Sequence, residues 1–228
     1  MTDYAFQPAP VPSVAIAGST ARFPVRRIFC VGRNYAEHAR EMGMDDRDPP
    51  FFFTKPADAV VDSGATIPFP PLTENLHHEI ELVVAIGKGG ADIAAESALD
   101  HVFGYAVGID LTRRDLQFAA RDKGRPWDWG KAFDASAPCG AIRPVAESGH
   151  PDSARIWLAV DGAVRQDSDI AELTWPVRDI IAFASQSVAL APGDLIFTGT
   201  PAGVGPLQRG QTVTGGVDGI GEIALTLI

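Results

Sequence analysis

The sequence has few of the residues that mark several large classes of protein. Cys30 and Cys139 are its only cysteines, too few for a disulfide framework and not spaced like a metal-binding knuckle. No apolar run reaches the roughly 20 residues that a membrane span needs, and the opening residues do not read as a targeting leader. Basic residues are also in the minority, with 19 Lys and Arg against 29 Asp and Glu. A net charge of −10 disfavours nucleic acid and anionic membranes as partners, so we expect a soluble, cytoplasmic protein that binds neither.

The chain is rich in apolar residues and in turn-forming residues. Hydrophobic residues make up 46% of its 228 residues, enough for the core of one domain. The 23 Gly and 18 Pro residues indicate short strands and many turns, and the Pro-rich residues 1–12 are expected to lie extended on the surface. Strand-like runs cover residues 23–31, 51–54, 79–86, 102–109, 156–160, 195–198 and 222–228. They outnumber helical patterns and do not alternate with them, which favours an α+β fold with a mixed or mostly antiparallel sheet.

A few local signals predict turns and helix starts. Asp-Gly pairs at 161–162 and 218–219 stand between strand-like segments and predict hairpin turns. Asn34, Thr112 and Pro176 each suit the N-terminus of a helix, Thr112 as part of a near-match to a capping box. The predicted helices cover residues 35–42, the stretch from Thr112 to about residue 121, and residues 177–190.

The most informative stretch is the strand-like segment that begins with Glu79 and Glu81. Alternate residues of a strand share a face, so the two carboxylates point the same way. Neighbouring carboxylates repel each other unless something neutralises them, and an all-carboxylate set favours Mg²⁺, Ca²⁺ or Mn²⁺. Asp110 ends another apolar strand and is a third candidate ligand. The alternatives are a solvated strand edge for the two glutamates and a turn or helix start for Asp110.

A second candidate site is the pair His38 and Glu41 on the first predicted helix. They are three residues apart and would be neighbours on one face. A carboxylate bonded to an imidazole raises its basicity, which makes His38 a candidate general base. The alternative is ordinary charge pairing on an exposed helix.

Other signals are weaker. The glycine-rich residues 199–205 lack the Lys-Ser/Thr ending of a phosphate-binding loop, and no G-x-S-x-G elbow suggests a serine hydrolase. Residues 123–131 mix basic and aromatic side chains, and Lys131 could be a surface lysine or a pocket cation.

Five stretches of the chain together resemble the fumarylacetoacetate hydrolase family. They are VGRNYAEH (31–38), HEIE (78–81), GIDLTRRDLQ (108–117), GKAFD (130–134) and GDLIFTGTP (193–201). Each is loose alone, but five in this order are specific, and the resemblance runs from about residue 27 to the C-terminus. FFFTKPAD at 51–58 is similar to members that cleave fumarylpyruvate.

The resemblance implies a fold, a cofactor and a set of site residues. The implied fold is a mixed β-roll or barrel-like α+β catalytic domain with few short helices over residues 25–228, after a short N-terminal extension over residues 1–24, and the implied assembly is a homodimer. One Mg²⁺ or Mn²⁺ per subunit would be held by Glu79, Glu81 and Asp110. The residues implied in catalysis are His38, Glu41 and Lys131, and those implied in binding a small 2-oxo acid are Gln117 and the backbone near Thr200. Arg33, Lys55 and Arg125 remain open candidates for a cation that binds a distal carboxylate.

The resemblance also implies a reaction, hydrolysis of a carbon–carbon bond in an acylpyruvate. Fumarylpyruvate is the expected substrate, giving fumarate and pyruvate in aromatic-compound catabolism. One alternative is an oxaloacetate decarboxylase, or another 2-oxo acid lyase, that uses the same metal. A more distant alternative is a metal-binding dimer without catalytic activity.

Overall fold

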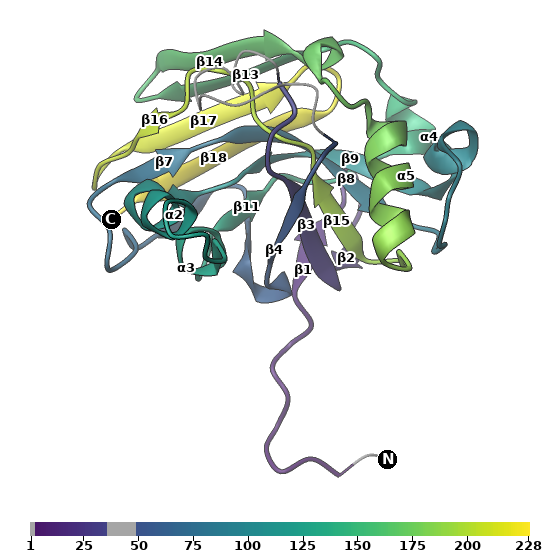
Figure 1. The fold of residues 1–228 in the computed structure, drawn as a ribbon, viewed down its shortest axis with the longest axis horizontal. Coiled ribbons are helices and arrows are strands. Elements are labelled where there is room, and N and C mark those ends of the chain that lie inside the picture. Colours follow the sequence, from purple (N-terminus) through teal and green to yellow (C-terminus); the bar gives the residue numbers. More distant parts are fainter. Residues whose placement is uncertain (1–2, 36–48) are drawn as a thin grey trace.

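The structure of the protein is a computed structural model that describes residues 3–35 and 49–228. Residues 3–12 contain no helix or strand, and most of this segment runs away from the folded body (Figure 1). This differs from our expectation that they lie along the surface. A domain boundary at residue 24 stays a prediction.

Two β-sheets make up most of the folded body (Figure 1). The larger has eight strands in the order β4-β3-β15-β8-β9-β11-β5, with β12 paired to β9. Its strands are β3 (Arg27–Val31), β4 (Phe52–Lys55), β5 (Val60–Asp62), β8 (Ile80–Ile86), β9 (Val102–Ile109), β11 (Ala137–Cys139), β12 (Arg143–Pro144) and β15 (Asp194–Phe197). The β3–β15 and β5–β11 pairs are parallel and the other pairs antiparallel.

The second large sheet has five strands in the order β14-β13-β17-β18-β6. Its strands are β6 (Ala65–Ile67), β13 (Arg155–Val160), β14 (Ala163–Asp169), β17 (Thr212–Val217) and β18 (Gly221–Leu227). Residues 161–162 connect β13 to β14, and residues 218–219 lie between β17 and β18. Both positions are those that the Asp-Gly pairs predict.

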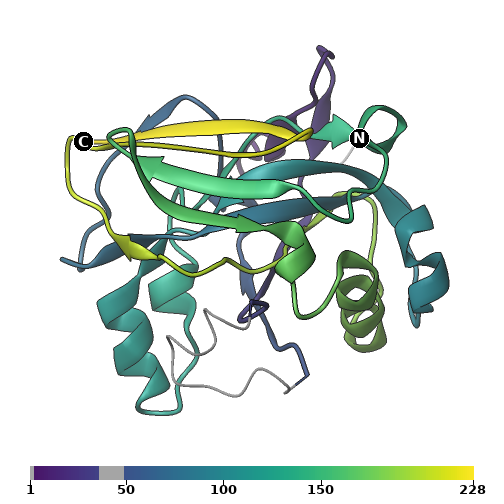
Figure 2. The same ribbon diagram turned by 90° about the horizontal axis from the view of Figure 1, so that it is seen from above.

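Two small sheets and short helices complete the described chain. The small sheets are β1 (Ser13–Ala15) with β2 (Arg22–Pro24), and β10 (Thr112–Arg113) with β7 (Leu76–His78) and β16 (Gly205–Pro206). The α-helices are α2 (Arg114–Arg121), α3 (Asp128–Lys131), α4 (Val145–Ser148) and α5 (Val177–Ser187), and the 3₁₀ turns are η1 (Ala57–Ala59), η2 (Ala95–His101) and η3 (Ile170–Glu172). Helices α2 and α3 lie together at one end of the molecule, away from α5 (Figures 1 and 2). No helix of the described chain is long and apolar enough to cross a membrane.

Strand β8 is buried along its whole length and lies between two hydrophobic cores. Ile80 and Leu82 belong to the main core, which fills the space between the large sheets, whereas Val83 and Ala85 belong to a second core on the other face. The apolar run after Glu81 therefore reflects a strand buried on both sides. The mixed sheets and few helices confirm the α+β, barrel-like fold predicted from the sequence.

The predicted capping box at Thr112 is wrong. Thr112 pairs with β7, and its hydroxyl donates to the Asp110 carbonyl and accepts from Lys131, so it is not available to a helix terminus. Helix α2 begins at Arg114 instead. Helix α5 follows Pro176 as expected but ends at Ser187, three residues early. The helix predicted over residues 35–42 lies, beyond Tyr35, outside the described residues.

Candidate metal centre and active site

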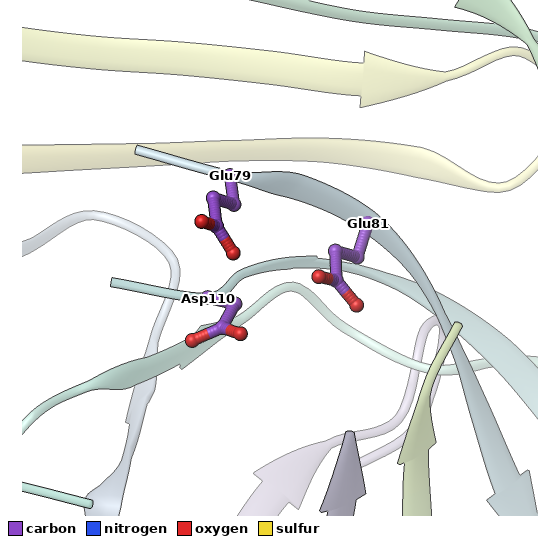
Figure 3. Close-up of side chains that lie close together, drawn as sticks. All are labelled: Glu79, Glu81 and Asp110. Carbon is purple, nitrogen blue, oxygen red and sulfur yellow. The ribbon is translucent and has the colours of Figure 1, made fainter. Parts of the chain in front are cut away.

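The three predicted metal ligands come together at the ends of two neighbouring strands. Glu79 precedes β8, Glu81 is its second residue, and Asp110 directly follows β9. The antiparallel register pairs Glu81 with Gly108, and the Asp110 N–H donates to the Glu79 carbonyl at 2.8 Å, which places Asp110 opposite Glu79. One carboxylate oxygen from each residue lies within 4.8 Å of the others, and all three side chains face the same space (Figure 3).

All three acids are buried, with at most 4% of any residue exposed. Glu81 forms no ion pair with any described residue, and one of its oxygens accepts the Gly199 backbone N–H at 2.8 Å. Burial, reinforced by the charges of Asp110 and Glu79, raises the pKa of Glu81 well above its usual range. A divalent cation among these oxygens would remove that penalty, and carboxylate oxygens are the donors that Mg²⁺ and Mn²⁺ prefer. The residues present therefore fit the metal.

Lys131, the last residue of α3, contacts two of the three acids through its ammonium group. Its Nζ donates to Glu79 Oε2 and Asp110 Oδ2, both at 2.7 Å, and to Thr112 Oγ1 at 2.6 Å. Burial lowers the pKa of this ammonium, but the charges of Asp110 and Glu79 raise it by more, so the pKa lies above its usual value. Lys131 is thus a buried ammonium that donates to two of the three acids at the centre of the site.

Two further cations, Lys55 and Arg114, form ion pairs with the acids. Lys55 Nζ lies 2.8 Å from Asp110 Oδ1 and donates to the carbonyls of Leu111 and Lys131. Arg114 forms an ion pair with Glu79 and donates to Gln117 Oε1 at 2.6 Å. Together these cations and Lys131 balance the three carboxylates in number, yet all the ion pairs that they form with the three acids within the described chain are to Glu79 and Asp110.

Comparison with known proteins identifies the family. A sequence model described as the C-terminal domain of fumarylacetoacetate (FAA) hydrolase matches residues 27–228. The chain belongs to the fumarylacetoacetate hydrolase family. This confirms the family predicted from the five sequence stretches.

Individual members of the fumarylacetoacetate hydrolase family are similar over most of the chain. A fumarylpyruvate hydrolase of Ralstonia sp is 49% identical over 181 residues, which cover 78% of this chain and 92% of that protein. The mitochondrial oxaloacetate tautomerase of Homo sapiens is 40% identical over 195 residues, with 86% and 88% covered. The crystal structure of fumarylpyruvate hydrolase from Pseudomonas aeruginosa in complex with Mn²⁺ and pyruvate has a TM-score of 0.96 and 55% identity, and covers 99% of both chains.

A pocket of about 420 Å³ opens beside the acidic centre. Lys131 lies at its inner end, and its walls come from the region of β4 and from the residues before α3. Trp127 meets Phe51 edge-on at 5.4 Å and lies 5.9 Å from Phe53, measured between ring centroids. The pocket thus combines the buried, charged Lys131 with half-buried aromatic residues and the exposed Arg125 and Asp128.

The remaining predicted residues have different positions. Gln117 is buried on α2 against Arg114, and Thr200 is buried with its hydroxyl accepting from Gln166 Nε2 at 2.8 Å. The Arg33 guanidinium lies over the Phe51 ring, 5.2 Å from its centroid. His38 and Glu41 lie outside the described residues, so their pairing stays a prediction.

Sequence reasoning missed two residues of the site, Arg114 and Gln166. Arg114 stands inside the GIDLTRRDLQ stretch, which could have marked it as the partner of a buried acid. Gln166 accepts from the His78 ring and the Ile80 N–H and donates to Thr200, so it ties the ligand strand to the 198–201 loop. It sits in a polar strand with no local sign of burial, and only the packing of the two sheets places it here.

Proposed function

We propose that this protein is a metal-dependent hydrolase that cleaves a carbon–carbon bond of an acylpyruvate, with fumarylpyruvate as its substrate and fumarate and pyruvate as its products. The observation that carries the proposal is the 0.96 TM-score, over 99% of both chains, to a fumarylpyruvate hydrolase in complex with Mn²⁺ and pyruvate. The buried acidic centre of this chain gives it the residues that such chemistry needs.

Glu79, Glu81 and Asp110 would hold one Mg²⁺ or Mn²⁺ per subunit. When bound, the cation supplies Lewis acidity toward the oxygens of a 2-oxo acid and stabilises negative charge that develops on them. Lys131 adds a second positive charge at the same place. Its ammonium is held by Glu79 and Asp110 before substrate arrives, so no reorganisation is needed when an enolate forms.

The water that attacks needs a base, and we assign this role to His38, oriented by Glu41. Water adds to the distal acyl carbonyl, and its proton passes to the imidazole. The bond between that carbon and the pyruvate methylene then breaks, its electron pair stays with pyruvate as the enolate, and a proton returns to carbon. This sequence gives one carboxylic acid and one pyruvate for each water consumed.

Oxaloacetate chemistry is the second candidate, because relatives named oxaloacetate tautomerase are 40% identical over 86% of this chain. Decarboxylation or tautomerisation of oxaloacetate would use the same acids and Lys131, but would need no attacking water. Steady-state assays with fumarylpyruvate, acetylpyruvate and oxaloacetate, each with Mn²⁺, Mg²⁺ or chelator, separate the candidates. Cleavage of fumarylpyruvate above the other substrates supports the proposal, and turnover of oxaloacetate alone contradicts it.

The proposal extends to assembly and location, as a homodimer that acts in the cytoplasm in aromatic-compound catabolism. The similarity to fumarylpyruvate hydrolases of Ralstonia sp and Pseudomonas aeruginosa supports the metabolic role. Size-exclusion chromatography with light scattering tests the dimer, and a monomeric mass for active protein would contradict it.

A further inference from the structure

We infer that Arg125 is the residue that recognises the distal carboxylate of the substrate, so that this site selects acylpyruvates whose acyl group is planar and ends in a second carboxylate. The inference rests on the proposed function and deepens it. Three observations carry it: the position of Arg125, its availability, and the aromatic walls of the pocket that Arg125 and Lys131 both line.

Arg125 and Lys131 line the same 420 Å³ pocket. Lys131 is buried and bound to the acidic centre, whereas Arg125 is solvent-exposed and lies six residues before Lys131, the last residue of α3. A substrate whose 2-oxo acid end meets the acidic centre would extend its acyl group toward the outer end, where a cation is present.

Availability distinguishes Arg125 from the other two candidate cations. The Lys55 side chain has no exposed surface and its ammonium contacts Asp110 and two carbonyls. Arg33 lies over the Phe51 ring and is not among the residues that line the pocket. The Arg125 guanidinium, by contrast, has no hydrogen bond or ion pair within the described chain, although Asp128 lines the same pocket. Its donors are therefore open to a carboxylate, which guanidinium binds through two parallel hydrogen bonds.

The walls fit a flat acyl group. Four aromatic residues line this pocket, Phe51, Phe52, Phe53 and Trp127, and the Trp127 ring lies against those of Phe51 and Phe53. Aromatic rings offer large, flat apolar surfaces, which a planar group can contact by offset stacking. A conjugated, planar acyl chain such as the fumaryl group would lie between these rings with its carboxylate at Arg125.

The experiment compares substrates with and without the distal carboxylate. Fumarylpyruvate and acetylpyruvate share the 2-oxo acid end, so kcat/KM is measured for both with Mn²⁺-loaded wild type, Arg125→Ala, Arg125→Lys and Lys123→Ala. Lys123 is the matched control, because it is an exposed cation two residues away that lines a neighbouring groove and not this pocket. The acetylpyruvate activity of each variant also reports whether it folds.

We expect Arg125→Ala to lower kcat/KM on fumarylpyruvate by about 10- to 100-fold, the usual range for loss of hydrogen bonds to a charged group. Its activity on acetylpyruvate should stay within about twofold of wild type. Arg125→Lys should recover part of the loss, since lysine keeps the charge but not the two-point geometry, and Lys123→Ala should resemble wild type on both substrates.

An equal loss on both substrates, an equal loss in Lys123→Ala, or full fumarylpyruvate activity in Arg125→Ala would each overturn the assignment of Arg125. None of these results would contradict the proposed function, which fails on a different observation, the absence of acylpyruvate cleavage by the wild-type protein.

Discussion

The backbone N–H of Gly199 donates a 2.8 Å hydrogen bond to the Glu81 carboxylate, and so joins two positions 118 residues apart in the chain. Glu81 is the one acid of the centre whose contacts within the described chain include no cation, so this bond fixes its oxygens. Gly199 adopts φ = +97°, and a Cβ there would lie 2.7 Å from Asn34 Cβ. A glycine is required here for both reasons.

Substitution of this glycine should therefore impair the metal centre. We expect Gly199→Ala to weaken Mn²⁺ binding by about tenfold or more, because moving the loop removes a hydrogen bond to a charged group. Gly162→Ala is the matched control, since Gly162 also has positive φ, +79°, but open space around its Cβ. Isothermal titration with Mn²⁺ should show the loss in Gly199→Ala alone, and equal affinities would contradict this role of the loop.

Metal binding should stabilise the protein through Glu81. Ligand that binds only the folded state adds about 2.7 kcal/mol at 100 times its Kd, which for a chain of this size corresponds to a rise in Tm of about 5–10 °C. Glu81→Gln should melt at or above the wild type in chelator, because it removes repulsion from Asp110 and Glu79, yet should gain little from Mn²⁺. Asp167→Asn removes an exposed acid and is the control. A full Mn²⁺-dependent rise in Glu81→Gln would contradict this site.

Lys131 should matter for stability as well as for turnover. Lys131→Met leaves Glu79 and Asp110 without their shared ammonium, and removing one partner of a buried ion pair costs roughly 3–5 kcal/mol. We expect that loss in urea unfolding of the chelated protein, whereas Lys123→Met, an exposed control, should change stability by less than about 0.5 kcal/mol. With Mn²⁺ present, Lys131→Met should still bind metal but lose kcat/KM on acylpyruvates. Unimpaired turnover in that variant would remove Lys131 from the mechanism.

Much of the fold and of the site could be predicted from the sequence, for identifiable reasons. Period-two spacing placed Glu79 and Glu81 on one face, and the apolar run after them indicated a strand buried on both sides. That Asp110 meets them depends on strand register, which the resemblance implied and local pattern could not provide. Thr112 was misassigned because its hydroxyl serves Lys131, a long-range contact that overrides capping preference. Gln166 could not be found at all, since its partner His78 lies 88 residues away on another sheet.

The His38–Glu41 pair should separate hydrolysis from oxaloacetate chemistry. A general base contributes typically about 10²–10⁴-fold, so His38→Ala should lower acylpyruvate hydrolysis by roughly that factor. Any decarboxylation of oxaloacetate should fall much less, because it needs no activated water. Glu41→Ala, which removes only the orienting group, should have a smaller effect than His38→Ala. The readout is kcat for both substrates with metal content checked, and an equal loss on both would contradict the role of His38 as base.

The central claim is metal-dependent cleavage of fumarylpyruvate, and product analysis tests it most directly. Purified protein is stripped with chelator, reloaded with Mn²⁺, and incubated with fumarylpyruvate while ¹H NMR follows the products. We predict one fumarate and one pyruvate for each substrate consumed by the reloaded protein, and no turnover by the stripped protein or by reloaded Glu81→Ala. Undiminished cleavage after complete metal removal, or intact fumarylpyruvate after incubation with the reloaded wild type, would contradict the account.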